Sequence, residues 1–73
     1  MSSLHDRLQK IRREKKLSQT ELANQVGLSL RAYQYYERGE RQPTASVLIS
    51  LADYLNCSVD YLLGRTDNPE VNK

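Results

Sequence analysis

Five times along this 73-residue chain, a Ser or Thr that can cap a helix precedes a short run of apolar residues at helical spacing. The caps are Ser3, Ser18, Ser29, Thr44 and Ser58, and the residues that can end a run are Gly27, Gly39, Asn56 and Gly64. Glycine and asparagine accept the left-handed backbone that terminates a helix, so these stops fit the caps before them. The sequence therefore predicts an all-α fold with helices over residues 3–16, 18–27, 29–38, 44–55 and 58–63.

The length of the chain limits it to one domain, because 73 residues cannot close a second hydrophobic core. Hydrophobic residues make up 38% of the chain and charged residues 27%, proportions that are ordinary for a folded domain and argue against disorder. We assign residues 1–64 to the folded domain. Residues 65–73 are polar and contain Asn68 and Pro69, so we expect a short, loose C-terminal tail.

Several kinds of functional site are disfavoured by the residues that the sequence lacks. Cys57 is the single cysteine, so it cannot form an internal disulfide, and a buried hydrophobic role fits it better than a redox role. His5 has no second ligand near it that would mark a metal site. No credible arrangement of Ser, His, Cys or paired carboxylates suggests catalysis. We therefore expect no enzyme activity, no metal and no cofactor.

Membrane insertion and export are also disfavoured. No apolar run approaches the roughly 20 residues that span a bilayer, and the first residues lack the apolar stretch of a signal peptide. We expect a cytoplasmic protein that does not associate with membranes.

Charge is distributed unevenly along the chain. Residues 1–41 contain nine basic and five acidic side chains, a net charge of +4, whereas residues 42–73 contain two basic and four acidic ones, a net charge of −2. The basic part could bind a polyanion such as nucleic acid. It could equally be a solvated surface, and charge alone leaves both interpretations open.

The segment from Gln19 to Gly39 has the spacing of a helix-turn-helix. Two short helices are expected there, joined by a turn of three or four residues that contains Gly27. Ala23 is small enough to let the two helices cross closely. Helical hairpins are common in small proteins, however, so this spacing by itself favours DNA binding only weakly.

A more specific indication comes from a longer combination of motifs. The run from Leu17 to Gly64 reads LSQTELANQVGLSLRAYQYYERGERQPTASVLISLADYLNCSVDYLLG. It resembles the phage repressor and Cro family, also called Xre-type transcriptional regulators. The resemblance implies a compact five-helix, lambda-repressor-like domain in which residues 29–38 form the recognition helix. It also implies a sequence-specific regulator, with repression as the expected effect, that reads the major groove of double-stranded DNA.

The expected recognition helix has two distinct faces. On a helical wheel, the side chains that can contact a base or a phosphate lie on one face, and two of the three tyrosines of this helix lie on the opposite face. The outward residues are Arg31, Gln34, Tyr35 and Arg38, and the inward ones are Tyr33 and Tyr36. Arginine can pair with guanine and glutamine with adenine, each through two hydrogen bonds. The resemblance assigns the base-contacting positions to Leu30, Arg31, Ala32, Gln34 and Tyr35.

Other positions are assigned by the resemblance to the DNA backbone or to the protein's own stability. Gln19 matches a position that contacts the DNA backbone and often braces a side chain of the recognition helix. Further candidates for phosphate contacts are Arg12, Arg13, Arg38 and Arg41. Arg12 and Glu37 match a pair that forms an internal salt bridge, and we favour that role for Arg12 over contact with DNA.

Three residues depart from the family pattern. Lys16 stands where the family often has glycine, so the turn after the first helix is expected to be strained or differently shaped. Tyr33 replaces a branched aliphatic residue, and its hydroxyl must find a polar partner. Tyr35 is bulkier than the usual polar residue, so it could pack against the sugar-phosphate backbone instead of a base.

Dimerisation is expected because one recognition helix reads few base pairs. The family commonly pairs through the region of its last helix. Here Val59, Tyr61, Leu62 and Leu63 offer more apolar surface than so short a helix should bury within one molecule. We expect a homodimer through Val59, Tyr61 and Leu62 on a palindromic operator. Two alternatives remain open: the antitoxin of a toxin–antitoxin pair, and a protein-interaction or antirepressor module that has lost DNA binding.

Overall fold

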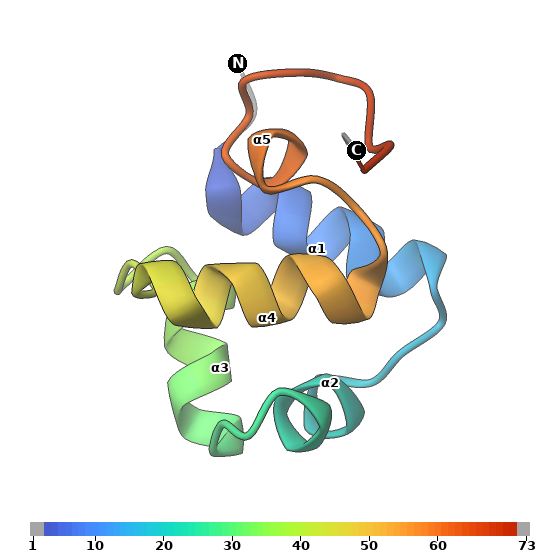
Figure 1. Ribbon diagram of the computed structural model, residues 1–73. Coiled ribbons are helices and arrows are strands. Elements are labelled where there is room, and N and C mark those ends of the chain that lie inside the picture. Colours follow the sequence, from blue (N-terminus) through green and yellow to red (C-terminus); the bar gives the residue numbers. More distant parts are fainter. Residues whose placement is uncertain (1–2, 72–73) are drawn as a thin grey trace.

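The computed structural model describes residues 3–71, and that part of the chain contains five helices and no strand (Figure 1). The helices are α1 (Leu4–Glu14), α2 (Gln19–Gln25), α3 (Leu30–Glu37), α4 (Ala45–Leu55) and α5 (Val59–Leu62). All five expected caps are confirmed, because the side chains of Ser3, Ser18, Ser29, Thr44 and Ser58 each accept a hydrogen bond from the backbone N–H three residues later. The all-α prediction is therefore correct, and its helices begin where the sequence indicated.

The stops between the helices also follow the prediction. Asn56 ends α4 in the left-handed conformation at φ 55°, and Gly27 takes φ 73° in the turn after α2. Lys16 lies in the left-handed region as well, at φ 58°, where a side chain with a Cβ is strained. The expected strain in the turn after α1 is thus present.

One hydrophobic core joins all five helices. Its largest fully buried side chains are Tyr33, Leu8, Leu22, Leu51, Leu55 and Leu62. Ala23 is also fully buried where α2 meets α3, as expected for a close crossing. Cys57 is buried, and burial raises the pKa of its thiol to about 11, so the unreactive protonated form prevails near neutral pH. No helix within residues 3–71 is both long enough and apolar enough to cross a membrane.

The core corrects the expectation for α5. Tyr61 is only 3% exposed and Leu62 is fully buried, because both side chains point into the protein's own core. Val59 packs partly against the same core, and Leu63, at 44% exposed, is the most open of the four apolar residues. The surplus of apolar surface inferred from the sequence is therefore much smaller than expected. The reason is that α5 lies across α1 and α4, which cover it.

The residues expected to form a tail make contacts with the domain in the part that the structure describes. Buried Arg7 of α1 donates a hydrogen bond to the carbonyl oxygen of Thr66 at 3.1 Å and forms an ion pair with Asp67. The N–H of Ser58 donates to the carbonyl oxygen of Pro69 at 2.9 Å. The tail thus folds back over α5 and α1 instead of leaving the domain (Figure 1). Residues 1, 2, 72 and 73 lie outside the described residues.

Candidate nucleic-acid interface

Helices α2 and α3 form a tight helix-turn-helix. The turn begins at Val26 and is closed by a hydrogen bond of 2.9 Å from the N–H of Leu28 to the carbonyl oxygen of Ala23. Leu22 on α2 and Tyr33 on α3 are both fully buried at the junction. This packing fixes α3 at the edge of the bundle, where one of its long faces lies outside the core (Figure 1).

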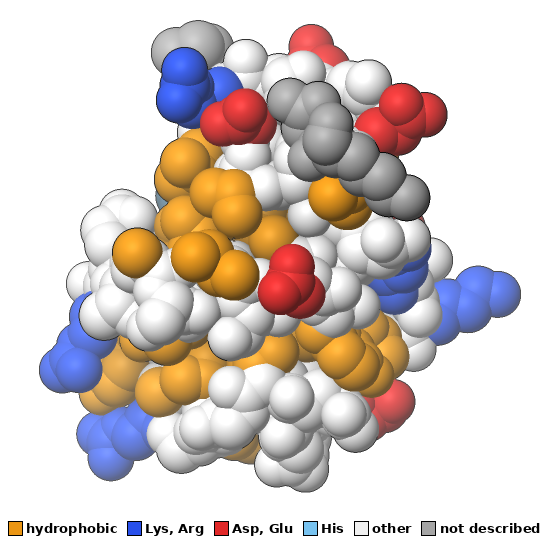
Figure 2. All heavy atoms as spheres, in the orientation of Figure 1, with side chains coloured by type: hydrophobic (Ala, Val, Ile, Leu, Met, Phe, Trp, Pro, Cys, Tyr) orange, Lys and Arg blue, Asp and Glu red, His pale blue; other side chains and the backbone are white. Residues whose placement is uncertain are grey.

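The outer face of α3 is open to solvent. Arg31 is exposed, Leu30 is 40% exposed, and Ala32, Gln34 and Tyr35 are half-buried. On the opposite face Tyr33 and Glu37 are buried and Tyr36 is half-buried. The division of the helix into two faces is therefore as predicted. In Figure 2, basic side chains project from the edge of the molecule that α3 occupies in Figure 1.

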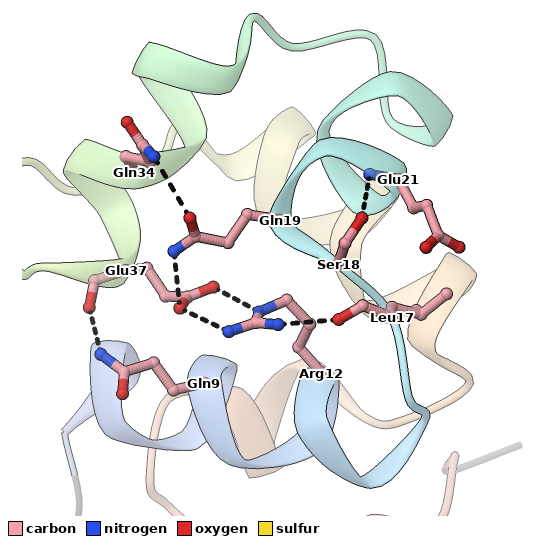
Figure 3. Close-up of polar contacts among 8 residues, drawn as sticks. All are labelled: Gln9, Arg12, Leu17, Ser18, Gln19, Glu21, Gln34 and Glu37. Atoms are coloured by element: carbon pink, nitrogen blue, oxygen red, sulfur yellow. Dashed lines mark hydrogen bonds and ion pairs between the residues drawn. The ribbon is translucent and has the colours of Figure 1, made fainter.

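An ion pair beneath α3 joins it to α1. The guanidinium of Arg12 donates from Nε to one carboxylate oxygen of Glu37 at 2.7 Å and from Nη2 to the other at 3.0 Å (Figure 3). Its third nitrogen, Nη1, donates to the carbonyl oxygen of Leu17 at 2.7 Å. The Arg12 side chain is 11% exposed and that of Glu37 is 3% exposed. The expected internal pair is present, and it favours the structural role of Arg12 over a phosphate contact because all three of its nitrogens have partners inside the protein.

Amide side chains extend this ion pair towards the surface. Gln19 donates from Nε2 to Glu37 at 3.1 Å, and its own Oε1 accepts from Nε2 of Gln34 at 3.2 Å. Gln19 therefore braces the outward-facing Gln34, as the sequence indicated (Figure 3). Gln9 of α1 donates to the backbone carbonyl of Glu37 at 2.8 Å, a contact that sequence reasoning missed. Its position three residues before Arg12, on the same helix face, was the available signal.

The protonation of Glu37 depends on this network. Burial alone would raise the pKa of its carboxyl group, but Arg12, the neighbouring Tyr33 hydroxyl and Gln19 together outweigh burial and hold the pKa below its ordinary value. Glu37 is thus a carboxylate at neutral pH, and the buried pair stays charged on both sides.

Tyr33 places a polar atom inside the same region. Burial, and to a smaller extent the neighbouring Glu37 carboxylate, raise the pKa of its phenol far above the ordinary value. The hydroxyl lies beside Glu37, but within residues 3–71 it makes no hydrogen bond of acceptable geometry. The expected partner for this hydroxyl is therefore not found among the described residues.

Three arginines surround the ring of Tyr35 on the outer face. The guanidinium carbons of Arg41, Arg38 and Arg31 lie 4.5, 5.6 and 6.0 Å from the ring centroid. Arg31 also donates from Nε to the Tyr35 hydroxyl at 3.2 Å. Sequence reasoning named these four residues as DNA contacts but did not foresee that they form one cluster. Arg13, another candidate phosphate contact, is exposed on α1.

Comparison with known proteins places this geometry among DNA-binding domains. A family model described as helix-turn-helix matches residues 8–62. The uncharacterized HTH-type transcriptional regulator YqaE of Bacillus subtilis is 39% identical over 90% of this chain, and the phage CTXphi transcriptional repressor RstR of Vibrio cholerae is 39% identical over 85%. The chain spans 57% and 55% of the lengths of these two relatives.

A solved structure agrees with the fold in detail. The P22 c2 repressor protein in complex with a synthetic operator superimposes with a TM-score of 0.82 at 35% sequence identity. The match covers 86% of this chain and 96% of that one. The five-helix arrangement described above is therefore that of a phage repressor DNA-binding domain.

Proposed function

The chain belongs to the helix-turn-helix family, and from that premise we propose that it is a transcriptional regulator, acting as a repressor, that places α3 in the major groove of double-stranded DNA. The observation that carries this proposal is the outer face of α3, where Arg31 is exposed and Gln34 and Tyr35 are half-buried, although the inner face is held by buried contacts. A helix that served only to complete the core would not need an arginine and a glutamine on its outer face.

Base contacts are expected from the first turns of α3. Arg31 can donate to O6 and N7 of guanine through its two terminal nitrogens, and Gln34 retains its carbonyl oxygen and one amide hydrogen for adenine after its contact with Gln19. Leu30 and Ala32 can contact a thymine methyl group. Tyr35 belongs to the same face and lies at its basic edge.

Backbone contacts are expected from side chains around this face. Gln19 lies next to Gln34, and Arg38, Arg41 and Arg13 are exposed cations that can reach phosphate groups. Such contacts set the position of the protein on DNA without selecting a sequence.

We further propose that the protein binds a palindromic operator as a homodimer. Two recognition helices related by a twofold axis would read half-sites one helical turn apart, about 34–36 Å centre to centre. The interface expected at α5 must use Val59 and the exposed Leu63, because Tyr61 and Leu62 are already buried. Sedimentation on a selected duplex tests this: a complex containing a single copy of the protein would exclude the dimer.

Selection of bound sequences from a pool of random duplexes tests the function itself. We expect enrichment of a symmetric site and a steep fall in affinity as salt rises, because binding releases counterions from DNA. Absence of any enriched sequence would contradict the proposal and favour a module that binds only protein. Co-purification of a toxin protein with this chain would instead favour an antitoxin.

A further inference from the structure

Tyr35 is the common neighbour of the three arginines on the outer face of α3. The face of an aromatic ring attracts cations, whereas the three guanidinium groups repel one another. One of the three, Arg38, pairs with the carboxylate of Glu40 at 3.4 Å. A single carboxylate does not neutralise three guanidinium groups, so the cluster keeps an excess of positive charge. Because the ring keeps three cations close together, this part of the surface can bind an anion favourably.

The backbone keeps Arg41 beside this ring. The carbonyl oxygen of Tyr35 accepts hydrogen bonds from the N–H of Glu40 at 2.9 Å and of Arg41 at 3.4 Å. The turn after α3 is therefore folded back onto the helix end, and Arg41 is the arginine that approaches the ring most closely. Its position depends on local structure and on the ring together.

The hydroxyl of Tyr35 acts on a different arginine. It accepts the hydrogen bond from Nε of Arg31, which leaves Nη1 and Nη2 of Arg31 available at the outer edge of the helix. Two parallel N–H groups are what a bidentate contact with guanine needs. Holding Nε fixes the plane in which those two groups lie.

We propose that Tyr35 is a positioning residue: its hydroxyl orients Arg31 towards a base, and its ring gathers Arg38 and Arg41 at one backbone phosphate. This role rests on the proposed function, because it requires α3 to lie in the major groove. Tyr35 then links the contact that selects a sequence to the contacts that bind any sequence, and it does not itself read a base.

Two substitutions separate the hydroxyl from the ring. Tyr35→Phe removes the hydrogen bond to Arg31 and keeps the ring, so we expect the preference for one base pair to fall about threefold to tenfold, while the salt dependence stays the same. Tyr35→Leu also removes the ring. We therefore expect the slope of log K against log salt to become less steep by about one unit, the value for one lost phosphate contact. Fluorescence anisotropy with the selected duplex and its single-base variants measures both quantities.

Matched arginine variants test the phosphate contact. We expect Arg41→Gln to reduce the salt slope by about one unit in the otherwise unchanged protein and by less when combined with Tyr35→Leu. Arg65→Gln removes the same charge from an exposed arginine after α5, which is paired with Asp60, and we expect it to leave the slope unchanged. Thermal unfolding of each variant shows that the fold is retained.

The outcomes are distinguishable. A Tyr35→Leu variant that is folded and keeps the full salt slope overturns the positioning role, while the proposed function stands if the unchanged protein binds its duplex. A Tyr35→Leu variant that changes the preference at a base pair other than the one affected by Arg31→Ala also overturns it and makes Tyr35 a base reader. An unchanged protein that binds no duplex in a salt-dependent manner overturns the proposed function, and the role of Tyr35 with it.

Discussion

On the inner face of α3, Glu37 is buried and its charge is matched by Arg12, whereas on the outer face Arg31, Arg38 and Arg41 gather around Tyr35 with one carboxylate, that of Glu40, beside them. Both faces use arginines held by directional contacts. Arg12, whose side chain is 11% exposed, has protein partners for Nε, Nη1 and Nη2. The exposed side chain of Arg31 makes a single hydrogen bond within residues 3–71, through Nε.

The difference shows how one short helix can serve both stability and binding. A buried ion pair that lacks one partner is costly, so the inner face fixes the angle and register of α3 against α1. An exposed cation without a partner lowers the stability of the fold very little. The outer arginines can therefore remain available to bind an anion of another molecule. Changes on the inner face should therefore alter stability, and changes on the outer face should alter binding alone.

The largest effect is expected from Glu37→Gln, which leaves the nearly buried Arg12, 11% exposed, without its carboxylate. We expect the free energy of unfolding to fall by about 3–5 kcal/mol, as measured by urea denaturation. Glu40→Gln is the matched control, because Glu40 also pairs with an arginine but is half exposed, and its loss should cost less than about 1 kcal/mol. Equal losses in the two variants would remove the distinction between the faces.

On the outer face, we expect Arg31→Ala to weaken binding to the best duplex by about 1–3 kcal/mol and to relax the preference at one base pair. Its free energy of unfolding should stay within about 0.5 kcal/mol of the original, since Arg31 is exposed. Binding titrations on single-base variants measure the first quantity. Equal loss on all duplexes would make Arg31 a backbone contact.

Acid should weaken the inner face specifically. The pKa of Glu37 is held below its ordinary value in the folded protein, so its contribution to stability is present above about pH 4.5 and is lost as the pH falls through the lowered pKa. We expect a smaller loss than for substitution, because the loss on protonation is limited by the size of the pKa shift. Denaturation from pH 6 down to about pH 3 should show a steeper decline for the original protein than for Glu37→Gln.

The smallest effect is expected from Tyr33→Phe, and in the opposite direction. The buried hydroxyl of Tyr33 makes no hydrogen bond within residues 3–71, so its removal should raise the free energy of unfolding by about 1 kcal/mol. A loss of stability would instead mean that the hydroxyl donates to Glu37 or to a bound water in solution. Chemical denaturation of the two proteins side by side measures the difference.

Much of the interface could be predicted because its signals are local or belong to the family pattern. The cap at Ser29 and the helical spacing after it place Arg31 and Gln34 on one side of a helix, whatever the rest of the chain does. The ion pair between Arg12 and Glu37 and the support of Gln34 by Gln19 followed from the resemblance. Gln9 was missed because its partner is a backbone carbonyl 28 residues away.

Local chemistry within a few residues therefore accounts for where each helix begins and ends and which side of α3 is polar. The burial of Tyr61 and Leu62, the return of the tail to Arg7 and the meeting of three arginines at Tyr35 arise only when the elements pack. Such contacts depend on how whole helices cover one another, and the contact between Arg7 and Asp67 joins residues 60 positions apart. Periodicity along the chain shows that a face is apolar, but packing selects what covers it.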